Sequence, residues 1–586
     1  PPRSTPKPSS AASDVYKRQI QSMSISVSYA SGPSDKPLLG STIPEFFDNI
    51  VHKHGDRDAV ISLHQGLRFT YKELAQEVNV LAKAFLAAGF SKGDRVGIWS
   101  PNNIEWLTTQ YASSKAGIIL VTINPAYRVH ELAYVLEQSG CKGLVLQNQF
   151  KTSDYEGMIV ELCPELASSQ PGNLSSDKFP SLSHIISITS SELSGIYNFK
   201  DFLALADQSS DEDLANRQSS QDLDEPINIQ YTSGTTGFPK GATLSHHNIL
   251  NNGYFCASTM NFTERDRLVV PVPLYHCFGM VMGNLGCLSH GACAIYPSEG
   301  FEPESVLKAV QQEKATAVYG VPTMFIAELA LPNFDDYDLT SLRTGIMAGA
   351  PCPIETMKQV NELMHMTEVE IAYGMTETSP VSFQTRADSP LDKRVSTVGK
   401  VHPHVEVKIT DPETGKMCPI GIMGELCTRG YSVMLGYWEN EQGTAAAIDK
   451  TRWMHTGDIA VMDEDGYVNI VGRIKDMIVR GGENVYPREI EEYLMTNDAI
   501  EAVQVTGVPD SRFGEEIVAW VSLKDGAILT EEEVKAFCKD KIAHYKVPRY
   551  IRFSDDFPMT VTGKVQKFKM RDISMKELGL KEQNTA

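Results

Sequence analysis

INIQYTSGTTGFPKG, residues 227–241, is the stretch on which the interpretation of this chain depends. Apolar side chains alternate at Ile227, Ile229 and Tyr231, which predicts a strand, and this strand runs into a polar loop. Glycine lets backbone N–H groups turn toward one anion, hydroxyl groups add donors, and lysine adds a mobile positive charge. The sequence therefore predicts a phosphate-binding loop made of Thr232, Ser233, Gly234, Thr235, Thr236, Gly237, Phe238, Pro239 and Lys240.

The loop differs from the Walker A motif of P-loop kinases and GTPases. That motif has a glycine directly before its lysine and Ser or Thr directly after it. Here Pro239 precedes Lys240 and Gly241 follows it, which argues against those enzymes. On the residues alone, a polar surface turn rich in Ser, Thr and Gly is the alternative.

Length and composition indicate a large globular protein of ordinary composition. A chain of 586 residues predicts several domains, or one large body with an appendage. Apolar residues make up 42% and charged residues 22%, which is usual for globular proteins. The formal net charge of −21 argues against nucleic acid as the main partner, although it is compatible with a local basic groove for an anionic ligand.

No transmembrane segment is expected. Residues 268–298 carry no charged Asp, Glu, Lys or Arg side chain, but Pro271, Pro273 and several glycines favour a buried strand, turn and core helix. The 10 cysteines are scattered without zinc-binding spacing, which indicates reduced, mostly buried thiols. No feature of the sequence indicates an oligomeric state.

The N-terminal residues 1–40 are rich in Ser and Pro and lack hydrophobic periodicity, so disorder is expected there. Residues 10–19 look like appended sequence, which makes Met23 the expected start. Only a weak mitochondrial transit signal is present, carried by Arg3, Lys7, Lys17 and Arg18. The last residues, 584–586, carry no peroxisomal address.

Predicted strands and helices alternate along the first part of the chain. A capping box of Thr70 with Glu73 predicts a helix that ends at Gly89. Alternating segments follow, and this order predicts a parallel sheet with helices on both faces. The segments are strands 95–99, 118–122 and 143–146 and helices 105–115 and 130–138.

Two further regions divide the chain. Residues 163–226 are polar, with an acidic run at 211–213, and are expected to form a surface excursion containing one short element at 185–188. The composition changes again at 472–476, after a hairpin turn at 463–466, and about a hundred residues with their own strand and helix pattern follow. We expect a hinge at this second change.

Tyr373-Gly374-Met375-Thr376-Glu377 follows a strand-like run. A carboxylate at the end of a strand suits Mg²⁺, which binds one or two carboxylates and otherwise takes waters and phosphate oxygens. This pattern predicts Glu377 as a metal ligand. The alternative is a polar cluster that caps the start of a helix.

YTSGTTGFPKG and the later motifs resemble the adenylate-forming superfamily, which includes acyl-CoA synthetases, luciferases and the adenylation domains of peptide synthetases. The resemblance covers roughly residues 40–578. It implies an α/β fold with a large N-terminal domain of layered α/β subdomains and a small, mobile α+β C-terminal domain. The expected divisions are a disordered segment 1–40, an AMP-binding domain 41–474, a C-terminal domain 475–578 and a tail 579–586.

The resemblance implies roles in nucleotide binding for several residues. Thr376 would meet the α-phosphate, Glu377 would hold Mg²⁺, and Tyr373 beside Gly374 would contact adenine. The loop Gly349, Ala350 and Pro351 would form the second side of the adenine site. Asp458, in WMHTGD, would accept both ribose hydroxyls, Arg473 would add a ribose or phosphate contact, and His455 is given no role because Arg is common there.

The remaining implied roles fall mostly in the C-terminal part. Lys564, in PMTVTGKVQK, would reach into the site as a point charge and act in catalysis. Gly481 and Gly482 would border the pantetheine channel, and Lys475 would be the hinge residue. His276, in PLYHCFG, would lie at the acyl entrance, with an ordinary core histidine as the alternative.

The implied reaction is ATP-dependent ligation of a fatty acid to CoA through an acyl-AMP intermediate. Runs such as NPAYRVHELAYVLEQSGCK and GRIKDMIVRGGENVYP are similar to mitochondrial medium-chain acyl-CoA ligases, which implies a medium-chain substrate and the mitochondrial matrix, with the cytoplasm as the alternative. Two other functions share these motifs: an acyl-AMP ligase that serves a carrier protein, and a luciferase-like oxygenase, which would not depend on CoA. A non-enzymatic nucleotide-binding scaffold predicts a missing catalytic group, whereas Glu377, Asp458, Arg473 and Lys564 are all present.

Overall fold

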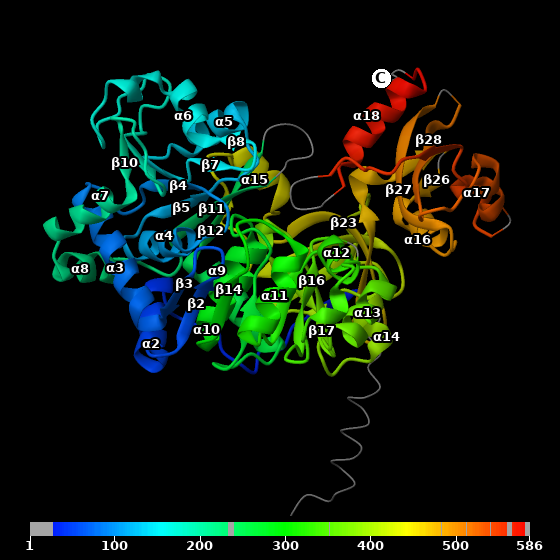
Figure 1. Ribbon diagram of the computed structural model, residues 1–586. Helices are drawn as coiled ribbons and strands as arrows, with labels where there is room; N and C mark the ends of the chain where they lie inside the picture. Colours follow the sequence, from blue (N-terminus) through cyan, green and yellow to red (C-terminus); the bar gives the residue numbers. More distant parts are fainter. Residues whose placement is uncertain are drawn as a thin grey trace, which may run out of the picture.

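The computed structural model describes residues 27–232, 239–350, 352–481, 483–510, 512–539, 541–559 and 565–580. Figure 1 shows large sheet-and-helix layers coloured blue to green, and a smaller body coloured orange and red beside them. The α/β fold predicted from the sequence, with a large N-terminal and a small C-terminal part, is confirmed.

The first large sheet has the strand order β10-β9-β6-β4-β5-β11-β12-β22. Neighbouring strands are parallel from β10 to β11, whereas β12 and β22 run antiparallel to their neighbours. The strands are β4 (Arg95–Trp99), β5 (Ile119–Thr122), β6 (Gly143–Leu146), β9 (His184–Ser187), β10 (Ile196–Asn198), β11 (Pro226–Thr232), β12 (Lys240–Ser245) and β22 (Gly436–Tyr437).

Helices bury both faces of this sheet, as the alternating sequence pattern predicts. Thr70 and Glu73 form the predicted reciprocal capping box at the start of α3 (Tyr71–Ala87). On one face lie α2 (Ile43–His54), α3, α4 (Ile104–Lys115) and α9 (His246–Thr259), and on the other α5 (Val129–Ser139) and α6 (Tyr155–Leu162). Parallel strands buried on both faces explain the continuous apolar runs in the sequence.

The second large sheet has the order β19-β18-β17-β16-β15-β13-β14-β2-β3 and is parallel from β17 to β2. Its strands are β2 (Asp58–Ser62), β3 (Leu67–Thr70), β13 (Arg267–Val269), β14 (Cys293–Tyr296), β15 (Ala317–Gly320), β16 (Thr344–Ala348), β17 (Glu368–Gly374), β18 (Val381–Gln384) and β19 (Lys400–Val401). Its helices include α10 (Gly286–His290), α11 (Pro303–Glu313), α12 (Pro322–Leu329), α13 (Ile354–Leu363) and α14 (Leu391–Ser396).

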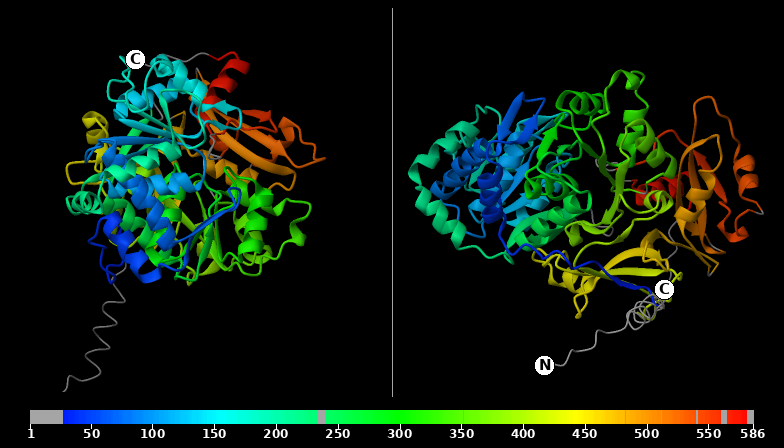
Figure 2. Two further views of the ribbon diagram at one scale, coloured as in Figure 1. Left: turned by 60° about the vertical axis from the view of Figure 1, so that its left-hand side comes forward. Right: turned by 90° about the horizontal axis from the view of Figure 1, so that it is seen from below.

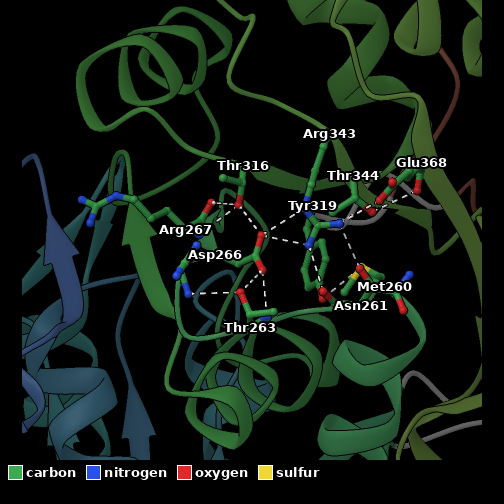
Figure 3. Close-up of polar contacts among 11 residues, drawn as sticks. Met260, Asn261, Thr263, Asp266, Arg267, Thr316, Tyr319, Arg343, Thr344 and Glu368 are labelled. Carbon is green, nitrogen blue, oxygen red and sulfur yellow. Dashed lines mark hydrogen bonds and ion pairs between the residues drawn. The ribbon is translucent and has the colours of Figure 1, made fainter. Parts of the chain in front are cut away.

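An ionic network ties the amino ends of these parallel strands together (Figure 3). Arg343, just before β16, lies 2.9 Å from the Asp266 carboxylate before β13 and 2.7 Å from Glu368 at the start of β17. Thr316, before β15, donates to the same Asp266 carboxylate at 2.8 Å. The amino edge is therefore fixed by structural contacts, which leaves the opposite, carboxyl edge for binding.

An antiparallel sheet follows, in the order β1-β20-β21-β23-β24. Its strands are β1 (Tyr29–Ser31), β20 (Val405–Thr410), β21 (Gly424–Gly430), β23 (Met454–Met462) and β24 (Val468–Arg473). In Figure 2 the blue N-terminal strand runs along the yellow sheet, where β1 pairs with β20. The expected disorder of residues 1–40 is therefore wrong for β1, because its backbone is paired in this sheet.

The C-terminal part has its own sheet, β26-β25-β28-β27, with β29 beside β28. The elements are β25 (Ile478–Arg480), β26 (Glu483–Val485), α16 (Pro487–Leu494), β27 (Ile500–Asp510), β28 (Gly514–Leu523), α17 (Glu531–Cys538), β29 (Tyr550–Phe553) and α18 (Lys567–Glu577). They enclose a separate apolar core that includes Ile478, Ile490 and Val521. The side chain of Arg488 donates to Ile470 O, which joins α16 to β24.

The structure corrects the prediction for residues 163–226 and confirms those for residues 268–298 and for the cysteines. Residues 163–226 are more than a surface excursion, because β9 is fully buried inside the first sheet and the acidic run opens α8 (Asp211–Ser219) with Ser210 as its cap. Residues 268–298 form the predicted buried strands and core helix, including a π-helix at Phe278–Leu285.

Among the described residues, no helix combines the length and apolar character that crossing a membrane requires. The cysteines are free thiols, and all but Cys352 are buried, as predicted.

Candidate functional site

The predicted phosphate-binding loop connects two antiparallel strands, β11 and β12. Thr232 is the last residue of β11 and pairs with Lys240, the first residue of β12. Pro239 and Lys240 are described and partly buried, whereas the predicted loop residues Ser233, Gly234, Thr235, Thr236, Gly237 and Phe238 lie outside the described residues. The hairpin therefore begins and ends at the carboxyl end of β11, where open α/β sheets bind ligands.

Glu377 lies at the base of this hairpin. Its residue is only 5% exposed, and it sits in a short 3-10 turn, Thr376–Thr378, directly after β17. The hydroxyl groups of Tyr437 and Thr232 lie 2.8 and 3.4 Å from Glu377 Oε1. The Lys240 ammonium lies 5.1 Å from the centre of the Tyr437 ring. A buried carboxylate thus contacts Thr232, where the loop begins, and Tyr437, whose ring lies near the Lys240 ammonium.

Tyr373, Asp458 and Arg473 come together although the sequence separates them widely. Asp458 in β23 is the register partner of Arg473 in β24, and Arg473 Nε lies 3.1 Å from Asp458 Oδ1. The Tyr373 hydroxyl donates to Asp458 Oδ2 at 2.5 Å. Burial, followed by the negative charge of Asp458, raises the pKa of Tyr373 well above its ordinary value. Tyr373 therefore stays a hydrogen-bond donor to the carboxylate.

Two glycines at this edge of the second sheet occupy positions that exclude side chains. A Cβ on Gly374 would lie 1.7 Å from Pro380 O, so the turn after Tyr373 requires glycine. Gly349, with φ of +87°, follows β16 directly. Because β16 and β17 are parallel neighbours, Gly349 and Ala350 emerge beside Tyr373 and Gly374. Pro351 lies outside the described residues.

His276 lies beside the strand that leads into the hairpin. The next residue, Cys277, has its Sγ 2.9 Å from Gln230 Oε1 in β11. His276 itself accepts through Nδ1 from Phe278 N at 3.2 Å, and its ring meets Tyr275 edge to face. The structure thus places His276 next to β11, while its predicted role at an acyl entrance stays a prediction.

The C-terminal residues are placed only in part. Lys475 lies in the short turn Ile474–Asp476 directly after β24, where the first part of the chain ends. Gly481, with φ of +62°, turns the hairpin between β25 and β26, and its N–H donates to Phe513 O at 2.7 Å. Gly482 and Lys564 lie outside the described residues.

Sequence reasoning missed two residues of this site. Tyr437 donates to the Glu377 carboxylate, and it lies in the run RGYSVMLGYW, residues 429–438, whose residue types do not by themselves indicate this contact. Glu425 Oε1 accepts from Gly457 N at 3.3 Å, one residue before Asp458. No local pattern indicates Glu425, because its contact depends on the pairing of β21 with β23.

Together these groups suit a nucleotide with its phosphates. The Asp458 carboxylate offers acceptors for vicinal hydroxyls. Glu377 offers one buried carboxylate, with hydroxyl groups around it, which fits a Mg²⁺ ion whose other ligands are waters and phosphate oxygens. Lys240 supplies positive charge on the phosphate side. All of these groups lie at the carboxyl ends of parallel strands or on the adjoining antiparallel sheet.

Comparison with known sequences also indicates a nucleotide-binding protein. The sequence model of the AMP-binding enzyme family matches residues 47–438, and that of the AMP-binding enzyme C-terminal domain matches residues 489–564. A candidate acyl-CoA synthetase of Bacillus subtilis, YngI, is 49% identical over 93% of this chain and 99% of its own. The mitochondrial medium-chain acyl-CoA ligase ACSF2 of Danio rerio is 46% identical over 95% of this chain and 92% of its own, and that of Homo sapiens 43% over 94% and 91%.

Solved structures share the architecture. ATP-bound MatB of Rhodopseudomonas palustris superposes with a TM-score of 0.79 at 28% identity, over 91% of this chain and 99% of that protein. The anthranilate CoA ligase AuaEII, in complex with anthranoyl-AMP, gives a TM-score of 0.81 at 25% identity, over 93% and 99%. The likeness therefore spans both the large and the small part of the chain.

Proposed function

Because this chain belongs to the AMP-binding enzyme family, we propose that it is an AMP-forming acid–thiol ligase that joins a medium-chain fatty acid to CoA at the expense of ATP. The observation that carries this proposal is the meeting of Tyr373, Asp458 and Arg473 near the carboxyl end of β17, where Glu377 also lies. Relatives named as medium-chain acyl-CoA ligases support the reaction and the substrate class.

The reaction has two steps. A carboxylate oxygen of the fatty acid attacks the α-phosphorus of ATP, and the bond to the bridging oxygen breaks to release pyrophosphate. The CoA sulfur then attacks the acyl carbon of acyl-AMP, and AMP leaves as the thiol proton passes to solvent. Little covalent chemistry falls on the protein, whose contribution is alignment and the stabilisation of charge.

The phosphate side of the site is assigned to the β11–β12 hairpin and Glu377. Backbone N–H groups and hydroxyls of residues 232–238, with Pro239 shaping the loop, would hold the β- and γ-phosphates, and Lys240 would add its charge. Glu377 would hold Mg²⁺, which neutralises phosphate charge when bound, and Thr376 would donate to the α-phosphate. Tyr437 keeps the Glu377 carboxylate oriented through its 2.8 Å hydrogen bond.

The nucleoside side is assigned to two adjoining strands and a glycine loop. Adenine would lie between Tyr373 with Gly374 and the loop Gly349, Ala350 and Pro351. The ribose hydroxyls would donate to the oxygens of Asp458. In this structure these oxygens accept hydrogen bonds from Tyr373 and Arg473. These two donors fix the orientation of the carboxylate before the nucleotide arrives.

The C-terminal part would act in both steps. Lys564 would stabilise the carboxylate and α-phosphate in the first step, and the turn at Gly481 and Gly482 would border CoA in the second. Both cannot face the same site at once, so residues 475–578 would rotate about Lys475 between the steps. The division at residues 474 and 475 is supported by the separate apolar core of the C-terminal sheet.

The names of the same relatives support a proposal for the cellular location. The vertebrate relatives are named as mitochondrial proteins, which supports a mitochondrial location for this chain, and the cytoplasm is the alternative. Fractionation of cells that express the full chain separates the two, because a matrix protein resists added protease until the inner membrane is opened.

The decisive experiment measures AMP and pyrophosphate release from MgATP across fatty acids of graded length, with and without CoA. Repeated turnover that requires CoA and peaks at medium chains is expected. A single burst that is indifferent to CoA would leave adenylation intact but contradict CoA as the acceptor, and would direct the search to a carrier protein or an amine. No release with any fatty acid would contradict the proposed activity.

A further inference from the structure

Three potential metal ligands lie together on one face of the antiparallel sheet, beside the nucleotide site. Cys427 in β21 is the direct register partner of His455 in β23, and Glu425 lies two residues before Cys427 in β21. Because side chains two apart on a strand share a face, all three point to the same side. The closest ligand atoms, the Glu425 carboxylate oxygen, Cys427 Sγ and a His455 ring nitrogen, lie within 4.8 Å of one another.

From this cluster we propose that Glu425, Cys427 and His455 bind a divalent transition-metal ion of the zinc class. Thiolate, imidazole and carboxylate form a mixed sulfur, nitrogen and oxygen set that zinc binds and that the hard ion Mg²⁺ does not prefer. The site is therefore distinct in chemistry from the magnesium site assigned to Glu377. Three protein ligands leave a fourth position for water.

The distances fit this ion with a small adjustment. For zinc bonds of about 2.3 Å to sulfur and 2.05 Å to nitrogen, tetrahedral geometry places the two ligand atoms about 3.6 Å apart. Cys427 Sγ and His455 Nδ1 are 3.6 Å apart. Glu425 Oε2 and His455 Nδ1 are 2.8 Å apart, shorter than the roughly 3.4 Å that a tetrahedral ion requires, so the carboxylate must move by roughly half an ångström.

A second carboxylate lies near the histidine. Asp449 Oδ2 is 3.8 Å from His455 Nε2, the ring nitrogen that the metal would not use, so it must approach by roughly 0.8 Å to accept a hydrogen bond from this nitrogen. Metal-binding histidines commonly donate their other N–H to a carboxylate, which sets the tautomer and the ring orientation. Lys408 in β20 is the register partner of Cys427, and its positive charge would repel a bound cation. Its ammonium lies 4.6 Å from the centre of the Trp453 ring. The two carboxylates, of Glu425 and Asp449, outweigh the charge of this one lysine.

Two further requirements of a metal site concern the path of the ion from solvent and the protons that its binding displaces. The His455 side chain is 37% exposed, so an ion can reach the cluster from solvent, whereas Cys427 is fully buried beneath it. Burial raises the pKa of the Cys427 thiol to about 11. The thiol therefore carries its proton before the ion arrives, and metal binding releases this proton to solvent. The proton with which His455 Nδ1 donates to Glu425 Oε2 must also leave Nδ1, and the other ring nitrogen, Nε2, can carry it.

The cluster is joined to the nucleotide site through Glu425. Its Oε2 faces His455, while its Oε1 accepts from Gly457 N at 3.3 Å. Gly457 directly precedes Asp458, which the proposed function assigns to the ribose. Widening the gap between Oε2 and His455 Nδ1 by the roughly half an ångström that the ion requires also displaces Oε1, which already accepts a long hydrogen bond from Gly457 N, so occupation of the site is expected to weaken nucleotide binding. This coupling, unlike the metal site itself, rests on the proposed function.

Cobalt(II) is the probe, because a thiolate ligand gives a cobalt complex an intense near-ultraviolet charge-transfer band. Titration of the full-length protein should produce this band and saturate at one equivalent, and zinc should displace it. Cys427→Ser should abolish the band, whereas Cys418→Ser, which removes a buried thiol in the connection between β20 and β21, should keep it. No band in the unaltered protein, or a band that survives Cys427→Ser, would overturn the proposal.

A second variant guards against misfolding of Cys427→Ser. His455→Gln alters a partly exposed side chain and should weaken cobalt affinity by at least about 10-fold, the size of effect that even outer-sphere partners have on metal affinity. Unchanged affinity in this variant would overturn the assignment of His455.

Calorimetry of AMP binding tests the coupling. Zinc should weaken AMP binding by about 10-fold, the effect of losing one hydrogen bond to a charged group. Cobalt binding with unchanged AMP affinity would overturn the coupling and leave the metal site standing. Absence of AMP binding in the metal-free protein would contradict the proposed function instead, and the cobalt band would still report on the site.

Discussion

Asp458 and Arg473 face each other across β23 and β24, with 3.1 Å between Asp458 Oδ1 and Arg473 Nε. The second carboxylate oxygen, Oδ2, accepts a hydrogen bond from the hydroxyl of Tyr373, which lies in a different sheet. The carboxylate is therefore oriented from two sides, with only 7% of the Asp458 residue exposed. This preorganisation supports the proposal that the pair binds the nucleotide.

Replacement of Asp458 by Asn tests the proposed contact of this carboxylate with the ribose. The amide group of Asn keeps one acceptor oxygen and can donate to the Tyr373 hydroxyl, but it loses the negative charge and an acceptor for one ribose hydroxyl. One ribose hydrogen bond is lost and the other is no longer made to a charged group, which predicts AMP binding that is about 10²-fold weaker. Calorimetry gives the value directly, and Tyr373→Phe, which removes one bond and keeps the ring, should lose about 10-fold or less. Wild-type affinity in Asp458→Asn would contradict the ribose assignment.

Replacement of Glu377 by Gln tests the metal assignment. The neutral amide has the same shape but binds Mg²⁺ weakly, so adenylation at fixed magnesium should fall by about 10²-fold. The rate of pyrophosphate exchange, measured over a range of Mg²⁺ concentrations, should show a higher requirement. Tyr437→Phe leaves the carboxylate and removes only its 2.8 Å hydrogen bond, so a smaller effect on the same curve is expected. An unchanged magnesium curve in both variants would count against this site.

Replacement of Lys564 by Ala separates the two half-reactions. Without the lysine charge, adenylation should slow by roughly 10²-fold or more, as when other preorganised electrostatic groups are removed. Thioester formation from supplied acyl-AMP and CoA should continue at close to the wild-type rate. Rapid-quench measurement of each half-reaction distinguishes them. An equal loss in both would show that Lys564 acts elsewhere.

Replacement of Lys475 by Pro tests the hinge. Proline fixes φ near −65° and restricts the residue before it, so rotation at this position becomes difficult. Complete turnover should slow while one half-reaction keeps its rate, and Lys475→Ala, which leaves the backbone free, should retain turnover. Steady-state and single-turnover rates provide the comparison, and full turnover in Lys475→Pro would place the hinge at another residue.

Replacement of Glu370 by Gln should stabilise the protein at neutral pH. Burial raises the pKa of Glu370 to about 8, well above its value in an unfolded chain. Folding therefore binds a proton, and the stability this proton provides is present below about pH 4.3 and is lost as pH rises toward 8. Gln mimics the protonated form and keeps a partner for Gln384, which now donates to Glu370 Oε2 at 2.8 Å.

The expected gain for Glu370→Gln is about 1–3 kcal/mol at pH 7 and close to zero at pH 4. Unfolding by guanidinium chloride at several pH values measures it. A gain of equal size at both pH values would show that the carboxyl group of Glu370 is not the source.

Local patterns predicted much of the fold. The capping box at Thr70 and the buried strands β4 and β6 follow from residues within one element, so they were predicted correctly. Strand β9 was only noted as a short element in a polar region, because its four buried residues, His184–Ser187, are too few to show periodicity. Its place in the sheet depends on parallel pairing with β6.

The sequence by itself determined the class of fold, the composition of the phosphate loop and the order of the motifs, because these depend on spacing and side-chain type along the chain. Tertiary structure alone decided which motifs meet. Strand pairing sets Arg473 opposite Asp458, and sheet packing brings Tyr373 to the same carboxylate. It also places Tyr437 on Glu377 and Glu425 beside Gly457. Such contacts join residues from different strands, so only the order and register of the strands could establish them.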